Sequence, residues 1–226
     1  SIENPYQSFD NNVNGTEILL NTLRKNGFKG KFIYASSASV YGEPMGDAPL
    51  VELDADKAIP LSRYALDKQQ NEAQAAYYSQ HYKFKCVGVR LFNVYGERQD
   101  PSSPYTGVIS IFADAIAQQN PITVYGDGGQ TRDFIYVKDV AQIICNLLLA
   151  DKINAIHGTV MNVGTGLAIS LNDLLHTMGV DTQKVKYVAP RVGDIRHSVA
   201  DISKLREQFP NFKPTDLSAG LHAFLS

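Results

Sequence analysis

Helical stretches and short apolar runs alternate through the first half of this 226-residue chain. Apolar residues at helical spacing predict a helix over 10–25, and a strand over 31–35 follows it. A second helix is expected from about 63 to 81, and the apolar run 86–92 predicts another buried strand. Because parallel strands need a long crossover between them, this order predicts an α/β fold, a parallel sheet with helices on its faces.

Turn signals are more frequent in the second half. Gly126–Gly129 follows a short predicted strand, and such a glycine cluster is typical of a hairpin turn. Asp139 is a predicted helix N-cap, Ser170 and Asp173 form a pattern like a capping box, and the tail from Val185 is expected to mix short strands and turns. The other elements predicted here are a loop over 100–104, helices over 108–119 and 140–150, and strands over 123–125, 134–137 and 159–163.

The composition favours a small-molecule site over a charged macromolecular partner. The chain is 44% hydrophobic, enough for one substantial core or for a large subdomain and a small one. Its 21 basic and 23 acidic residues give a net charge of -2, which provides no footprint for nucleic acid or an anionic membrane. The longest apolar stretch, near 143–150, is far short of the roughly 20 residues that cross a bilayer. Cys86 and Cys145 lie in apolar segments, which predicts two reduced core thiols of a cytosolic protein.

A tyrosine and a lysine stand one turn apart at the start of the second predicted helix. Tyr64 and Lys68 share a helix face, because residues four apart are neighbours there. A phenol has an ordinary pKa of about 10, and lowering it by about 3 units needs on the order of 4 kcal/mol of cationic stabilisation, part of which an adjacent ammonium supplies. The pair is a candidate proton-transfer unit, and an ordinary helix-surface pair is the alternative.

Hydroxyl side chains cluster directly after the first predicted strand. Ser36, Ser37 and Ser39 follow the apolar run that ends at Ala35. Ligands of parallel α/β sheets bind just beyond the carboxyl ends of the strands, so these hydroxyls are candidate ligand contacts. The alternative is that they only cap a turn.

Six blocks of residues extend over nearly the whole chain. They are DNNVNGT at 10–16, ASSASVYG at 35–42, Tyr64 with Lys68, RLFNVYG at 90–96, TRDFIYV at 131–137 and RVGD at 191–194. In this order they resemble the extended short-chain dehydrogenase/reductase family, and more closely its nucleotide-sugar epimerases. The resemblance implies a partial Rossmann-like parallel sheet with flanking helices and a smaller C-terminal substrate-binding α/β subdomain.

The resemblance also implies NAD as cofactor and three catalytic residues. Tyr64 as phenolate would take the proton of a sugar 4-hydroxyl while a hydride leaves C4, and Lys68 would hold the nicotinamide ribose. Ser37 would hydrogen-bond the reacting oxygen and relay the proton. A helix cap is the alternative role of Asn11. The cofactor contacts implied are Asn11, Ser36, Tyr64, Lys68 and Phe92.

For the UDP-sugar substrate, the resemblance implies contacts in the second half of the chain. Arg132 follows a glycine loop and suits a diphosphate clamp, whereas Arg191 and Asp194 would grip the phosphate and ribose at the nucleotide end. Surface ion pairing of Arg132, and loop stabilisation by the other two, are the alternatives. The substrate contacts implied are Ser37, Asn93, Val108, Val124, Tyr125, Arg132, Arg191, Asp194 and Ser198.

One block of the family is not found in residues 1–226. The family begins with a strand, a glycine-rich turn and a helix whose amides hold the NAD pyrophosphate. By analogy about 90 residues are missing, so the chain is expected to be a fragment that binds NAD weakly or not at all. The implied domains are 1–98 for NAD, with 133–165 returning to it, and 99–132 with 166–226 for the nucleotide sugar.

Two positions bear on the reaction and the sugar. The family's 4,6-dehydratases carry Asp and Glu directly after the hydroxyl residue that matches Ser37, where this chain has Ala38 and Ser39. An epimerase is therefore preferred over a dehydratase. Ser198 stands where epimerases restricted to glucose and galactose carry a bulky tyrosine. The small side chain predicts a preference for UDP-N-acetylglucosamine and UDP-N-acetylgalactosamine over the plain hexoses.

Two other functions stay open from the sequence. One is a nucleotide-4-keto-sugar reductase of the same family, and the other is a non-catalytic nucleotide-binding or dimerisation module. The resemblance further implies a homodimer formed through the helices near 10–25 and 63–81, a cytoplasmic location and a role in cell-surface polysaccharide synthesis. No metal, nucleic acid or membrane partner is expected.

Overall fold

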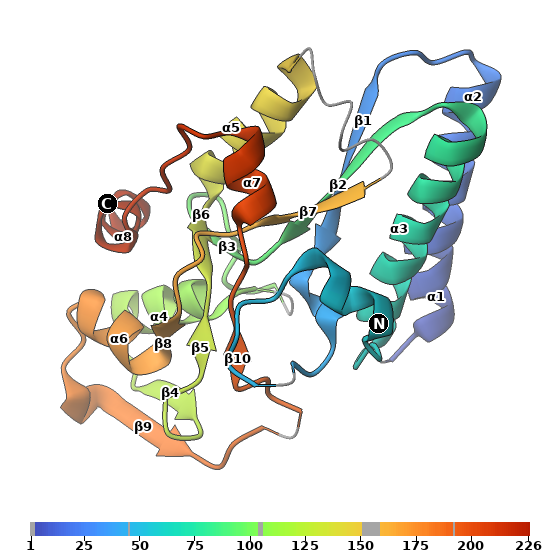
Figure 1. Cartoon of the computed structure of the whole chain (residues 1–226). Helices are drawn as coiled ribbons and strands as arrows, with labels where there is room; N and C mark the ends of the chain where they lie inside the picture. Colours follow the sequence, from blue (N-terminus) through green and yellow to red (C-terminus); the bar gives the residue numbers. More distant parts are fainter. Residues whose placement is uncertain (1–2, 45, 104–105, 151–158, 192) are drawn as a thin grey trace.

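A parallel sheet of three strands lies at the centre of the first half of the molecule (Figure 1). The computed structural model describes residues 3–44, 46–103, 106–150, 159–191 and 193–226. The strand order is β1-β2-β7, with bounds Lys31–Ser37, Lys85–Leu91 and Thr159–Val163. Ile33 pairs with Val87, and Val87 in turn with Thr159, so the carboxyl ends of the strands meet at one edge of the sheet. The predicted α/β fold is confirmed.

Helices cover both faces of this sheet (Figure 1). On one face lie α1 (Pro5–Phe9), the π-helical turn η1 (Asp10–Asn14), α2 (Gly15–Lys25) and α3 (Arg63–Tyr82). On the other face lie α5 (Val137–Leu149) and α7 (Ser203–Gln208). The first predicted helix thus begins earlier than expected, because the side chain of Asn4 caps α1 by accepting from the backbone N–H of Gln7 (3.0 Å).

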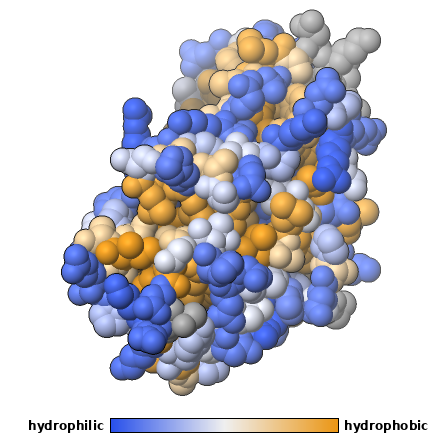
Figure 2. Space-filling model, turned by 90° about the vertical axis from the view of Figure 1, so that its left-hand side faces the viewer, coloured by the Kyte–Doolittle hydropathy of each residue, from blue (hydrophilic) through white to orange (hydrophobic). Residues whose placement is uncertain are grey.

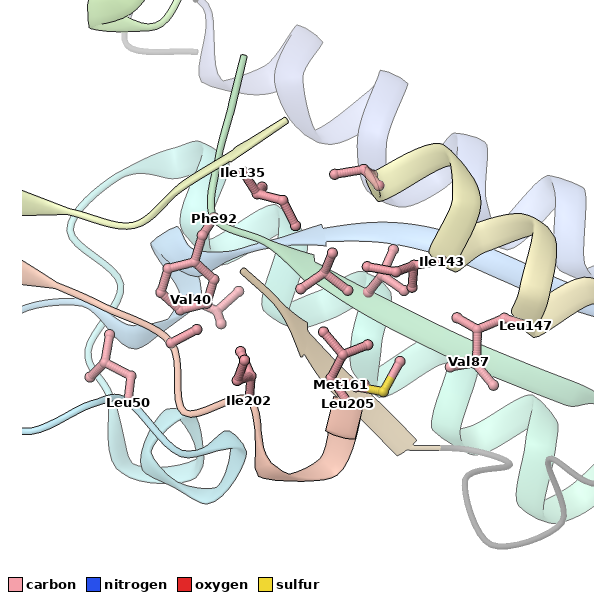
Figure 3. Close-up of a cluster of buried hydrophobic side chains, with 14 of the residues drawn as sticks. Val40, Leu50, Val87, Phe92, Ile135, Ile143, Leu147, Met161, Ile202 and Leu205 are labelled. Carbon is pink, nitrogen blue, oxygen red and sulfur yellow. The ribbon is translucent and has the colours of Figure 1, made fainter. Parts of the chain in front are cut away.

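Alternating side chains of the strands feed two separate cores. Phe32 and Cys86 pack with Tyr78 on the side of α2 and α3. Val87 points to the opposite side and packs with Ile143 of α5, as expected from the two-residue period of a strand. Figure 3 labels the members of this larger core: Val40, Leu50, Val87, Phe92, Ile135, Ile143, Leu147, Met161, Ile202 and Leu205.

Two short strands lead from this sheet into the second half. They are β3 (Asn93–Tyr95) and β6 (Phe134–Tyr136), which pair in parallel. The second half has its own core, which includes Ile109, Val124 and Leu174. Its elements are α4 (Val108–Ala117), β4 (Ile122–Tyr125), β5 (Thr131–Arg132), β8 (Ile169–Ser170), α6 (Leu171–Thr177), η4 (Thr182–Lys184), β9 (Val185–Val188), β10 (His197–Ser198) and α8 (Leu217–Leu225).

Two further 3₁₀ turns, η2 (Ala38–Tyr41) and η3 (Glu52–Lys57), lie between β1 and α3. Ile202 and Leu205, close to the end of the chain, pack into the core of the first sheet. The division of the chain into an NAD half and a substrate half stays a prediction. No helix within the described ranges has the length and apolar character needed to span a bilayer.

The predicted hairpin at Gly126–Gly129 is wrong. β4 pairs in parallel with β9, about 60 residues later, whereas β5 pairs with β8 and β10 in a different sheet. Gly126 and Gly128 have positive φ values of 77° and 73°, so the glycines form a turn between two sheets. The tail from Val185 also differs from expectation, because it contains the helices α7 and α8 as well as strands.

Asp139 is not a helix N-cap. α5 begins at Val137, two residues before it, and the Asp139 carboxylate instead accepts hydrogen bonds from the backbone and hydroxyl of Thr215 (2.7 and 2.8 Å). Ser170 does cap α6 as predicted, since its Oγ accepts from the backbone N–H of Asp173 (3.0 Å). Both cysteines are free, but only Cys86 is a core thiol, because Cys145 is exposed on α5.

Figure 2 shows the face of the molecule that lies to the left in Figure 1, near α4, α6 and α8. Apolar residues gather near its middle with hydrophilic residues around them. The exposed apolar side chains of α4 and α8 include Ile111, Ile116 and Leu225. This face of the molecule therefore carries exposed apolar side chains.

Candidate active site

Side-chain hydrogen bonds attach the start of α3 to the carboxyl end of β1. The ammonium of Lys68 donates to the carbonyl oxygen of Ala35 at 2.8 Å. One residue later, the amide of Gln69 donates to the carbonyl oxygen of Val40 at 3.1 Å. The turn that carries Tyr64 and Lys68 therefore lies beside the serine cluster, at the edge of the sheet where ligands bind in this fold class.

Tyr64 and Lys68 stand on one face of α3, as predicted. The Lys68 Nζ lies 5.6 Å from the centre of the Tyr64 ring. Tyr64 is 38% exposed. Burial lowers the pKa of Lys68, and the carboxylates of Glu72 and Asp67 oppose that effect. The helix start itself is fixed by Ser62, whose Oγ accepts from the backbone N–H of Ala65 (3.1 Å).

The serines of the cluster have separate roles in the structure. The Ser37 Oγ accepts from the backbone N–H of Ser39 (3.1 Å) and so caps η2. This bond uses an oxygen lone pair and leaves the O–H group of Ser37 to donate elsewhere. Ser36 is buried and donates to the carboxylate of Glu72. The catalytic role of Ser37 and the cofactor contact of Ser36 stay predictions.

A buried ion pair behind the site was not found from the sequence. The guanidinium of Arg90 is 3% exposed and donates through Nε and Nη2 to the Glu72 carboxylate, at 2.9 and 2.8 Å. It also donates to the hydroxyl of Tyr41 (3.1 Å), whose pKa burial raises to about 12. A lone arginine in a predicted buried strand was the available signal, since such a charge needs a partner. Because Glu72 lies one turn after Lys68, this ion pair supports the helix face that carries the dyad.

A cavity opens beside the end of β2. It has a volume of about 200 Å³, and Phe92, Asn93 and Val108 are among its lining residues. Phe92 is the predicted nicotinamide neighbour, whereas Asn93 and Val108 are predicted substrate contacts. The structure thus brings Val108 into one cavity with Phe92 and Asn93, which precede it by 16 and 15 positions. The Asn93 amide nitrogen also donates to the carbonyl oxygen of Asp133 at 3.3 Å.

The predicted nucleotide contacts gather in the second half. The Arg132 Nη2 donates to the Asp194 carboxylate at 2.6 Å, and its Nη1 donates to the carbonyl oxygen of Ile195 at 2.7 Å. Burial lowers the pKa of Arg132, and the charge of Asp194 opposes that effect. The guanidinium carbon of Arg191 stands 3.9 Å from the centre of the Tyr125 ring, a cation–π contact. The two arginines therefore each face a predicted substrate residue.

Three other predicted residues have distinct surroundings. Val124 is 1% exposed in the second core, so its side chain is not available to a substrate and only its backbone is. Ser198 is buried and pairs with Arg132 in the parallel ladder of β5 and β10. Asn11 is exposed within η1, in the middle of a continuous helical segment, which excludes the alternative that it caps a helix.

Comparisons with known proteins show the family of the chain. The model of the NAD dependent epimerase/dehydratase family matches residues 1–164. The chain belongs to this family. A putative UDP-glucose 4-epimerase of Methanocaldococcus jannaschii is 38% identical over 228 residues, which cover 98% of this chain and 70% of that protein. The family resemblance inferred from the six blocks is confirmed.

Two solved structures are also similar. A UDP-N-acetylglucosamine 4-epimerase from Methanobrevibacter ruminantium, in complex with UDP-N-acetylmuramic acid, has a TM-score of 0.83 and 35% identity, covering 96% of this chain and 68% of that one. A UDP-glucose 4-epimerase from Thermotoga maritima with UDP-glucose has a TM-score of 0.86 and 33% identity, covering 100% of this chain and 71% of that one. The chain spans about two thirds of the length of the curated relatives that it matches.

The residues described here fit one end of the NAD that the family uses. The ammonium of Lys68 and the partly exposed Tyr64 side chain stand at the carboxyl end of β1, and Phe92 lines a cavity at the end of the neighbouring strand β2. These groups suit the nicotinamide and its ribose. The glycine-rich cradle for the pyrophosphate is not found in residues 1–226.

Proposed function

We propose that the protein catalyses NAD-dependent epimerisation at C4 of a UDP-hexose. The observation that carries this proposal is the position of the Tyr64–Lys68 pair at the carboxyl end of β1, next to Ser37. A phenol, an ammonium and a hydroxyl at this edge form a set that can move a proton to and from a sugar oxygen. The dehydratase residues that would indicate elimination are replaced by Ala38 and Ser39.

Each residue has a defined task in the proposed reaction. Bound NAD⁺ supplies a reversible hydride acceptor. Tyr64 accepts the proton of the 4-hydroxyl, and Lys68 binds the ribose of the cofactor and favours the tyrosinate by its charge. Ser37 donates a hydrogen bond to the reacting oxygen. After the 4-keto sugar has turned over in the pocket, the hydride would return to the opposite face of C4 while Tyr64 returns the proton to the same oxygen, so the product has the opposite configuration.

The nucleotide end of the substrate is assigned to the second half. Arg132 offers planar N–H donors that suit the diphosphate. Asn93 lines the cavity at the end of β2. Arg191 and Asp194 are assigned to the phosphate and ribose. Holding the nucleotide at one end allows the hexose to rotate at the other, which epimerisation requires.

We further propose that a glycine-rich unit completes the NAD site by pairing with β1. Within the described ranges β1 pairs with β2 alone, so one edge of this seven-residue strand is open. An open, apolar edge of a parallel sheet is normally covered. The coding sequence upstream of Ser1 tests this proposal, which expects a strand followed by a glycine-rich turn there.

Ser198 is expected to select the acetamido sugars. Its small side chain lies on β10, directly opposite the proposed diphosphate ligand Arg132 on β5, and the Methanobrevibacter relative is named for UDP-N-acetylglucosamine. Replacing Ser198 with tyrosine should lower kcat/KM for UDP-N-acetylglucosamine more than tenfold and change that for UDP-glucose less than threefold, because the bulky ring fills the volume of the 2-acetamido group. The assay compares both sugar pairs with the full-length protein.

The matched control is Ser198→Ala, which adds no volume and should keep the preference. A strong preference of the unmodified protein for UDP-glucose, or no effect of the tyrosine, contradicts the assignment. Turnover without added NAD distinguishes an epimerase from the 4-keto-sugar reductase, which consumes reduced nicotinamide at each cycle. Absence of both activities would favour the non-catalytic alternative.

We propose that α2 and α3 form a homodimer interface. Ile18 and Leu19 on α2 are 59% and 47% exposed, and Tyr77 on α3 is 51% exposed. These apolar side chains belong to adjacent helices, so two copies can form a four-helix interface. A cytoplasmic location and a role in cell-surface polysaccharide synthesis are further proposals from the family resemblance.

Replacing Ile18 with glutamate should therefore convert the dimer to a monomer, measured by light scattering after size-exclusion chromatography. The introduced charges face each other across a two-fold interface and lose hydration there. Leu149→Glu on α5 is the control, because Leu149 is 79% exposed and lies on the opposite side of the first sheet. A monomeric unmodified protein, or dissociation by both variants alike, would argue against this interface.

A further inference from the structure

A buried carboxylate with no part in the proposed chemistry lies between the two dyad residues in sequence. Asp67 is 0% exposed. Its Oδ2 accepts from the hydroxyl of Ser8 (2.6 Å) and the amide of Asn12 (3.2 Å), and its Oδ1 accepts from Arg63 (2.7 Å). A buried charge with three donors is costly to form and costly to leave unpaired, so it holds its partners in defined positions.

These partners connect three elements. Ser8 belongs to α1, Asn12 belongs to the π-helical turn η1, and Arg63 is the first residue of α3. The guanidinium of Arg63 also lies 5.2 Å from the centre of the Phe9 ring. One carboxylate therefore fixes the first turn of α3 against α1 and η1.

The π-helical turn depends on α3 for its own hydrogen bonds. The backbone N–H of Gly15 donates to the carbonyl oxygen of Asp10, five residues back, instead of the usual four. This wider helical turn leaves nearby carbonyl oxygens without their usual backbone partners. The carbonyl oxygen of Asn12 accepts from Thr16 (2.6 Å), and that of Val13 accepts from Gln74 of α3 (3.2 Å). η1 and α3 thus form one joint, and Asp67 is the charged group within it.

We propose that Asp67 is a positioning residue for Tyr64 and Lys68: through Ser8, Asn12 and Arg63 it fixes the first turn of α3, and with it the side chains of the dyad. Asp67 lies three residues after Tyr64 and immediately before Lys68, on a neighbouring face of the same turn. A shift of this turn moves both catalytic groups relative to Ala35 and Ser37 on β1. The inference rests on the proposed function for its kinetic consequence but not for the joint itself.

The test compares Asp67→Asn with Tyr78→Phe in the full-length enzyme. Tyr78→Phe removes another bond between α3 and α2, that of the Tyr78 hydroxyl to Glu17 (2.7 Å), which lies about 16 Å beyond Asp67 along the helix. Asp67→Asn should lower kcat about 10- to 100-fold per folded molecule and change KM for the UDP-sugar less than twofold. Tyr78→Phe should change both less than twofold.

A second measurement does not depend on activity. Hydrogen–deuterium exchange of the amides of 10–14 and 63–68 should accelerate more than tenfold in Asp67→Asn and stay unchanged in Tyr78→Phe. Faster exchange in a protein that epimerises no UDP-hexose supports the joint and overturns only the proposed function. Unchanged exchange, or a kcat within twofold in folded Asp67→Asn, overturns the positioning role.

If Asp67→Asn does not fold, Ser8→Ala tests the positioning role of Asp67 instead. This variant removes one neutral donor to Asp67 and keeps the ion pair between Asp67 and Arg63. It should lower kcat about threefold and accelerate exchange in the same two segments. No change in either quantity would overturn the inference.

Discussion

Replacing Tyr64 with phenylalanine is expected to lower kcat for epimerisation by about 10³- to 10⁴-fold, because it removes the group that we propose accepts and returns the proton of the sugar hydroxyl. The ring remains in place, so its contact with the Lys68 ammonium is retained. KM for the UDP-sugar should change less than threefold, since the proposed nucleotide contacts lie in the second half of the chain. Steady-state kinetics with the full-length protein measure both quantities.

Tyr77→Phe provides the matched control on the same helix. Tyr77 is also exposed, and its hydroxyl lies more than three helical turns from that of Tyr64 along α3. Removing the Tyr77 hydroxyl should leave kcat within twofold of that of the unmodified protein. The amount of NAD that copurifies with each variant separates a chemical effect from lost cofactor. A Tyr64→Phe enzyme with more than a tenth of the normal kcat would show that another group moves the proton.

Local sequence patterns were sufficient for the first strand and the longest helix of the first half. The strand predicted over 31–35 and the helix over 63–81 agree with β1 and α3 within two residues. Each of these elements has a period and a terminal signal within its own residues, such as Ser62 at the start of α3. Tyr64 and Lys68 were found for the same reason, because their spacing of four residues is itself local.

Long-range partners account for the errors. Gly126–Gly129 resembles a hairpin turn in sequence, but the strand before it pairs with β9, which no local signal indicates. Asp139 has the residue type of an N-cap, yet its partner Thr215 lies 76 positions away. The residue type alone does not distinguish a buried carboxylate from an exposed one. The roles of Glu72 and Asp67 therefore follow only from the structure, in which α3 packs against its neighbours.

One missed element did have a local signal. Asp216 precedes the apolar run of α8 and caps it by accepting from the backbone N–H of Ser218 (2.9 Å). This is the usual pattern of a helix start. The short α7 has a similar local signal, because the Asp201 carboxylate accepts from the backbone N–H of Ser203 (2.8 Å), and its Leu205 is fully buried in the core of the first sheet.

The second large effect is expected at the nucleotide end of the site. Replacing Arg132 with methionine should raise KM for the UDP-sugar about 10- to 150-fold, because a hydrogen bond to a charged group contributes about 1.5–3 kcal/mol. kcat should fall less than fivefold, since Tyr64, Lys68 and Ser37 are untouched. Isothermal titration with UDP checks the same loss without turnover.

Arg196→Met is the control that separates substrate binding from loss of an ion pair. Arg196 and Arg132 each donate to an aspartate at 2.6 Å, to Asp127 and Asp194 respectively. The pair of Arg196 is largely exposed to solvent, whereas the side chains of Arg132 and Asp194 are only 17% and 28% exposed. An exposed pair contributes little, so Arg196→Met should change KM less than threefold. Equal effects of the two variants would assign Arg132 to loop stability, and a normal KM in Arg132→Met would remove it from the diphosphate site.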